Sequence, residues 1–97
     1  MKIHTKSGFV CEVDEDRAND WRFVKALADC DSGDESRVLR GMAFAVPFIL
    51  GEDGERKLMD HVTDEKGLIG SDRIMKEFRE VLSLIGEKQK KSSSSQA

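Results

Sequence analysis

The longest apolar stretch of this 97-residue chain runs from Met42 to Leu50 and is only nine residues long. A helix that crosses a bilayer needs about 20 consecutive apolar residues, so this stretch cannot span a membrane. It is the most apolar part of an amphipathic pattern that begins near Glu35, and we expect it to form a core helix. Pro47 removes one backbone hydrogen bond, which predicts that this helix ends or kinks near Val46.

A second amphipathic segment precedes this stretch. It begins at the acidic cap Asp14 and reaches about Cys30. Its apolar stripe consists of Trp21, Val24, Leu27 and Ala28. The stripe predicts that Trp21 lies in the core and that Phe23, which is off the stripe, is exposed.

Two further segments complete the helical pattern. A short helix is predicted over 55–62, and a longer one over 72–85 is predicted to be capped by Ser71 and stopped by Gly86. The candidate caps for the helix that begins near Glu35 are Ser32 and Asp34.

The N-terminus has the alternation of a β-hairpin. Residues 2–6 and 9–13 alternate in character around Ser7-Gly8, a two-residue connection that suits a tight turn. The residues expected on the buried face are Ile3, Phe9, Cys11 and Val13. A two-stranded ribbon is marginal alone in water, so this hairpin must pack on a helix or on another chain.

The C-terminal segment 87–97 has no apolar residue other than the final alanine, which predicts a disordered Lys/Ser-rich tail. Residues 1–86 are therefore expected to form one domain. Its predicted class is α+β and α-dominated, with an N-terminal β-hairpin followed by four short amphipathic helices.

Charge argues against a dedicated nucleic-acid binder. Nineteen acidic and sixteen basic residues give a net charge of −3. The one basic cluster, Lys88, Lys90 and Lys91, has no aromatic residue between its lysines for stacking on bases. Without an apolar leader we expect a cytoplasmic protein, in which Cys11 and Cys30 are reduced thiols, although one disulfide is arithmetically possible.

Catalytic and metal-binding patterns are missing from the sequence. His4 and His61 have no partner at zinc-ligand spacing, and both are expected to be exposed. Calcium-loop registers that begin at Asp14 or Asp29 lack the required glycine and the final glutamate. We therefore expect no catalytic residue, no cofactor, no metal and no enzymatic activity.

Some apolar residues lie beside the main stripes. We take these as candidate partner-binding residues: Phe23, Phe44, Phe48 and Met75. The use that best suits such residues on short amphipathic helices is to hold a helix of another protein in a groove.

The order of several motifs resembles one family. An acidic exit from the hairpin at 14–16 precedes Asp20-Trp21, and Leu50-Gly51-Glu52-Asp53 and the turn 64–67 follow. This order, over most of 7–85, resembles the small tail assembly chaperones of long-tailed bacteriophages and prophages.

The resemblance implies a non-enzymatic assembly factor of the bacterial host cytoplasm. Such a protein coats the tape-measure protein and recruits the major tail protein, and a frameshifted longer form is common in the family. Self-association through the hairpin edge or the last helix is a further expectation. The alternatives are a small adaptor or regulatory protein of a mobile element, or a nucleic-acid-binding regulator with a helix-turn-helix at 29–41.

Overall fold

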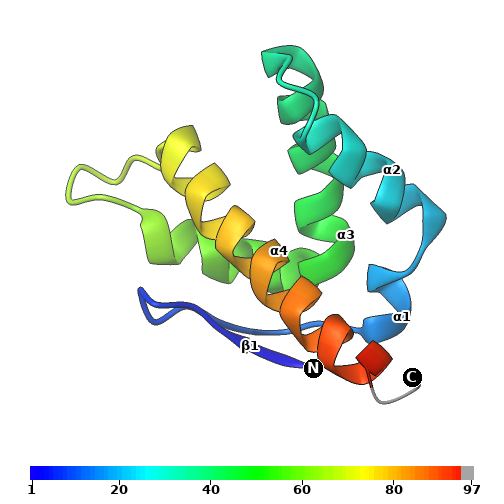
Figure 1. Cartoon of the computed structure of the whole chain (residues 1–97). Coiled ribbons are helices and arrows are strands. Elements are labelled where there is room, and N and C mark those ends of the chain that lie inside the picture. The colour runs from blue at the N-terminus through cyan, green and yellow to red at the C-terminus, as the bar shows by residue number, and fades with distance from the viewer. Residues whose placement is uncertain (95–97) are drawn as a thin grey trace.

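A short antiparallel hairpin leads into four helices in the computed structural model of this chain (Figure 1). The structure describes the backbone of residues 1–94 and the side chains of residues 1–90. The elements are β1 (Lys2–His4), β2 (Val10–Glu12), α1 (Glu15–Ala18), α2 (Trp21–Cys30), α3 (Glu35–Val62) and α4 (Ser71–Ser94). The helix-dominated class, the N-terminal hairpin and the number of helices are confirmed, whereas the helix boundaries differ from those predicted.

The hairpin pairs as its alternation predicts. Ile3 lies opposite Cys11, and these two side chains are buried together with Phe9 and Val13. The loop contains three residues rather than two, since the amide of Thr5 bonds to the carbonyl of Phe9 at 2.9 Å. Gly8 has φ +97°, a left-handed conformation that closes such a loop and that glycine adopts without steric cost.

The single helix predicted from Asp14 to Cys30 is wrong, because the chain forms α1 and α2 instead. Asp14 caps α1 as expected. The second helix starts at a cap of its own, since Asp20 has extended backbone angles and its carboxylate accepts from the amide of Arg22 at 2.8 Å. This new start decides which face of α2 meets the core.

Because α2 begins at Trp21, the predicted burial of Trp21 and the predicted exposure of Phe23 are both wrong. The buried residues of α2 are Phe23, Ala26 and Cys30, which recur at i, i+3 and i+7. Phe23 is 1% exposed and Trp21 is 70% exposed, the reverse of the prediction.

Helix α3 joins the second and third predicted helices across a kink. The interruption lies at Gly51, with φ +76° and ψ +169°, and not near Val46. Pro47 is inside the helical segment before the kink. The prediction placed the break about five residues too early, because the kink has a positive φ, which glycine adopts without steric cost. The apolar stretch is central to the core as expected, with Met42, Ala45, Val46, Ile49 and Leu50 buried.

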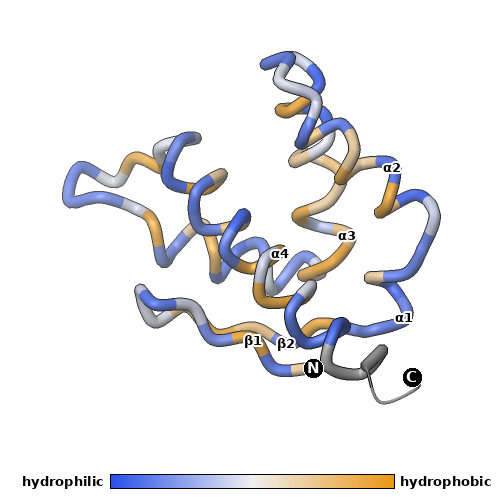
Figure 2. The backbone as a smooth tube through the Cα atoms, viewed as in Figure 1, coloured by the Kyte–Doolittle hydropathy of each residue, from blue (hydrophilic) through white to orange (hydrophobic). Residues whose placement is uncertain are grey.

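Helix α4 packs against β1 and α3, and α3 also packs against α2 and β2 (Figure 2). The buried face of α4 consists of Glu77, Phe78, Val81 and Ile85. Gly70, rather than Ser71, precedes the helix, and its carbonyl accepts from the amides of Arg73 and Ile74. Within residues 1–94, no helix combines the length and the apolar character that crossing a membrane requires.

The last helix does not stop at Gly86. That glycine has no positive φ, and α4 continues to Ser94 through residues that favour helix, including Glu87, Lys88 and Gln89. The predicted disorder of 87–97 thus differs from the helical backbone found over 87–94. The remaining positions of that segment, 95–97, lie outside the described residues.

Candidate functional site

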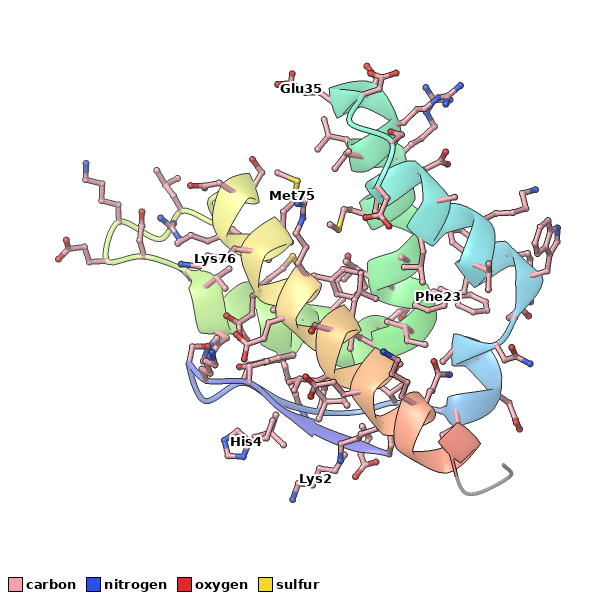
Figure 3. The ribbon with its side chains drawn as sticks, viewed as in Figure 1. Lys2, His4, Phe23, Glu35, Met75 and Lys76 are labelled. Carbon is pink, nitrogen blue, oxygen red and sulfur yellow. The ribbon has the colours of Figure 1, made fainter. Side chains whose placement is uncertain are left out.

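The structure divides the four candidate partner-binding residues among three environments. Phe23 is buried and lies on the side of α2 that faces α3 (Figure 3), so its expected exposure was wrong. Phe44 is 40% exposed and Phe48 is half-buried, and the two belong to one aromatic stack. Met75 is half-buried in a separate depression beside α4.

The aromatic stack extends from the core to the surface. The ring centroids of Phe23 and Phe48 are 6.2 Å apart, and those of Phe48 and Phe44 are 5.2 Å apart. The guanidinium carbons of Arg17 and Arg22 lie 5.4 and 5.2 Å from the centroid of the Phe48 ring, within the range of cation–π attraction. Arg17 also donates from Nη1 to the carbonyl of Phe48 at 2.9 Å, near the kink where helical acceptors are left over.

A small concavity lies beside this stack, between α2 and α3. Its volume is about 310 Å³, and it is lined by Arg22, Lys25, Ala26, Asp29, Arg40, Gly41 and Phe44. The two helices approach closely there, since a Cβ added to Gly41 would lie 2.5 Å from the carbonyl oxygen of Ala26. We call this concavity, together with Phe48 and Arg17, the α2–α3 face.

A further depression lies where α4 passes the α2–α3 turn, and we call it the α4 cleft. Its volume is about 580 Å³. Its apolar lining comes from Cys30, Val38, Leu39 and Met75, and its polar lining from Asp31, Gly33, Glu35, Ser71 and Arg79. A second depression of about 320 Å³ continues it, because the two share Cys30, Asp31 and Arg79 and the second adds Leu27, Leu82 and Ser83.

The cleft has both apolar and charged lining residues. Burial raises the pKa of the Cys30 thiol and the neighbouring Asp31 carboxylate adds to that effect, so the thiol is neutral near pH 7 and serves as apolar lining. Leu39, one of the residues that line this depression, is 54% exposed. Covering Leu39 would remove apolar surface from water.

A polar network lies in another depression along α4, of about 700 Å³, which is also lined by the hairpin loop and the end of α3. The hydroxyl of Ser7 lies 2.8 Å from His61 Nε2 and donates to Glu77 Oε2 at 2.8 Å. Thr5 Oγ1 donates to the same carboxylate oxygen, and the amide of Lys6 donates to Glu80 Oε2 at 2.6 Å.

This network does not have the arrangement of a catalytic triad. In a triad the carboxylate holds the histidine ring, whereas Glu77 bonds to the serine and to Thr5. The network instead joins the hairpin loop to α3 and α4. His61 is exposed, as predicted, and still bonds to Ser7.

Sequence patterns did not indicate two of these features. Ser7, His61 and Glu77 are separated by 54 and 16 positions, so no local spacing connects them. The exposure of Leu39 was not indicated either, because adjacent residues of one helix can both be buried, as Ala45 and Val46 are in α3.

The fold is that of a small helix-dominated domain with an N-terminal β-hairpin. Comparison with protein-family models, curated proteins and solved structures found no match to this chain. Among the residues that the structure describes, no three His, Cys, Asp or Glu side chains are placed to hold a metal ion together.

Proposed function

We propose that this chain is a non-enzymatic tail assembly chaperone of a long-tailed phage or prophage, which binds a helix of the tape-measure protein and helps to recruit the tail-tube protein. The observation that carries the proposal is the α4 cleft, a groove between helices that is lined by both apolar and charged residues and in which Leu39 is 54% exposed. A groove of this kind suits the apolar face of an amphipathic helix.

The length of the cleft supports a helical ligand. Ser71, Met75, Arg79 and Leu82 line it from α4 and lie on one face of that helix. The eleven steps from Ser71 to Leu82 rise about 16 Å along the helix axis, which is roughly the length of three turns of a bound helix. Val38 and Leu39 form the facing wall on α3.

The chemistry of the cleft supports a ligand whose sequence varies along its length. Met75 has an unbranched, flexible side chain that adapts to different apolar partners. Asp31 and Glu35 at one edge and Arg79 on α4 offer both signs of charge. Such an edge fixes the direction of a bound helix more than it adds affinity.

The identity of the partner comes from the resemblance of residues 7–85 to the tail assembly chaperones. A long tape-measure helix needs its apolar stripes covered until the tail tube closes around it, and many copies of a small domain would meet that need. Action in the host cytoplasm and recruitment of the major tail protein belong to the same proposal.

The gene neighbourhood gives the first test. A tail-tube gene upstream and a very long coiled-coil gene downstream are expected. The second test is co-expression of this chain with the product of that long gene, followed by affinity purification. The two proteins should purify together, and recovery of this chain alone while both are soluble would overturn the proposal.

A matched pair of variants locates the contact. Leu39→Glu places a charge in the cleft and should abolish co-purification, since burial of an unpaired carboxylate is costly. Leu68→Glu makes the same change at a leucine that is 62% exposed in the loop before α4, and it should have no effect. Equal loss in both variants would argue against the cleft.

The remaining alternatives predict other outcomes. A nucleic-acid-binding regulator requires a salt-dependent gel shift, and we expect none. A general adaptor of a mobile element would lack the tail-gene neighbours and would leave the tape-measure protein unbound.

A further inference from the structure

Positive charge is concentrated on the α2–α3 face of a chain whose net charge is −3. The concavity is lined by the cations Arg22, Lys25 and Arg40 and by one carboxylate, Asp29. Arg17 lies beside the same aromatic stack, 5.4 Å from the Phe48 ring centroid. The local charge is therefore opposite to that of the whole molecule.

Two of the cations are free to meet a ligand. Arg22 pairs with Asp20 at 3.0 Å, and Arg17 bonds to the carbonyl of Phe48. Within residues 1–90, Lys25 and Arg40 have neither an ion-pair partner nor a side-chain hydrogen bond, and both are exposed. They come from different helices and line one concavity.

Exposed apolar groups accompany these charges. The Phe44 ring, 40% exposed, forms part of the lining, while Ala26 and Gly41 provide a floor without long side chains. Trp21 is 70% exposed one helical turn before Lys25. Aromatic side chains and arginines together are the composition that dominates the energy of protein interfaces.

We propose that the α2–α3 face binds an acidic amphipathic helix of a second protein partner. Its apolar residues would cover Phe44 and the floor at Ala26 and Gly41, and its Asp or Glu side chains would pair with Lys25 and Arg40. This face shares no lining residue with the α4 cleft, so substitutions can be made in one surface without changing a residue of the other.

A single-stranded nucleic acid fits this face less well. A phosphate backbone favours a continuous cationic track, and Asp20 and Asp29 interrupt this one. The net negative charge of the chain also opposes a long polyanion. A short acidic helix needs only the two unpaired cations and the apolar floor.

Fluorescence anisotropy with three labelled probes and the full chain tests the proposal. The probes are an amphipathic Leu/Glu peptide of about five helical turns, the same peptide with Lys in place of Glu, and an oligothymidylate. The Leu/Glu peptide should bind, with affinity that falls as salt increases, and the other two should not. Absence of Leu/Glu binding, or tighter binding of the oligothymidylate, would overturn the proposal.

Charge-reversal variants identify the face. Lys25→Glu with Arg40→Glu should weaken Leu/Glu binding by about tenfold or more. The control Lys57→Glu with Lys66→Glu changes the net charge equally at exposed positions that line none of the described depressions, and it should change affinity less than about twofold. Equal weakening by the two pairs would reduce the effect to non-specific attraction and would contradict the proposal.

Two more variants keep the result interpretable. The neutral pair Lys25→Gln with Arg40→Gln should weaken binding while the circular-dichroism spectrum stays native. Leu39→Glu, which blocks the α4 cleft, should leave Leu/Glu binding intact. Loss of binding to the tape-measure protein can thereby be distinguished from loss of Leu/Glu peptide binding at the α2–α3 face.

Discussion

Thr5 donates a hydrogen bond to the carboxylate of Glu77 across 72 positions of the chain. Thr5 is 3% exposed and Glu77 is 9% exposed, so this bond joins the hairpin to α4 out of contact with most solvent. Ser7 donates to the same carboxylate oxygen. A buried acidic side chain is thus satisfied by two hydroxyls of one loop, which fixes the position of the hairpin on the helices.

We predict that Glu77→Ala lowers the free energy of unfolding by about 1–3 kcal/mol, because it leaves the Thr5 hydroxyl buried without its acceptor. Glu77→Gln keeps an acceptor oxygen and should cost less. Urea unfolding measures both variants. Glu65→Ala, at an exposed loop position, serves as the control, and equal stability of Glu77→Ala and Glu65→Ala would contradict the role of this bond.

The positions of Trp21 and Phe23 give a second prediction. Phe23→Ala should cost about 3–5 kcal/mol, because it removes a buried ring from the core. Trp21→Ala should change stability by less than about 0.5 kcal/mol, since most of the indole is already in water. Thermal unfolding of the two variants checks this order, and a larger loss at Trp21 would restore the stripe expected from the sequence.

Close contact between α2 and α3 gives a third prediction. Gly41→Ala should destabilise the protein by about 1–3 kcal/mol, because the added Cβ meets a backbone carbonyl that cannot turn aside. Gly86→Ala makes the same chemical change in α4, where a Cβ has no neighbour within 4 Å. That control should raise stability by about 0.4–1 kcal/mol. If both substitutions stabilise the protein, α2 and α3 do not approach closely at Gly41.

Cys11 gives a prediction about pH. Burial, aided by the charge of Glu12, raises the pKa of its thiol from 9.0 to about 11. Between these values the unfolded chain loses the thiol proton while the folded chain keeps it, so this group lowers stability as the pH rises from 9 to 11. The fall should be shallower in Cys11→Ala, as measured by urea unfolding at each pH. Parallel curves for the two proteins would exclude this contribution.

Local patterns predicted much of the fold. The hairpin face of Ile3 and Cys11 follows from strict alternation, and the burial of the Met42–Leu50 stretch follows from its apolar composition. Both are properties of a few neighbouring residues, so a single sequence is enough to identify them.

The face of α2 could not be decided locally. Trp21, Val24 and Leu27 form one acceptable stripe, and Phe23, Ala26 and Cys30 form another. The choice depends on contacts with distant residues, since Gly41 of α3 admits the carbonyl of Ala26 only when the second stripe faces inward. The size of the indole favoured the wrong stripe.

The candidate site was predictable only in part. Met75 lines the α4 cleft, but Leu39, which lines it from α3, was not among the predicted partner-binding residues. A break was predicted near Val46 because proline is a strong local signal, whereas the kink lies at Gly51, whose positive φ is not visible in the sequence. The network of Ser7, His61 and Glu77 depends on tertiary proximity alone.

The most direct test of the account is site-specific photocrosslinking in the co-expressed complex. A p-benzoylphenylalanine placed at position 39, in the α4 cleft, should crosslink this chain to the tape-measure protein on irradiation. The same residue at position 68, a loop site whose leucine is also more than half exposed, should not. Crosslinking from position 39 alone supports a chaperone that holds a tape-measure helix in the cleft; crosslinking from both positions equally, or from position 68 alone, would contradict it.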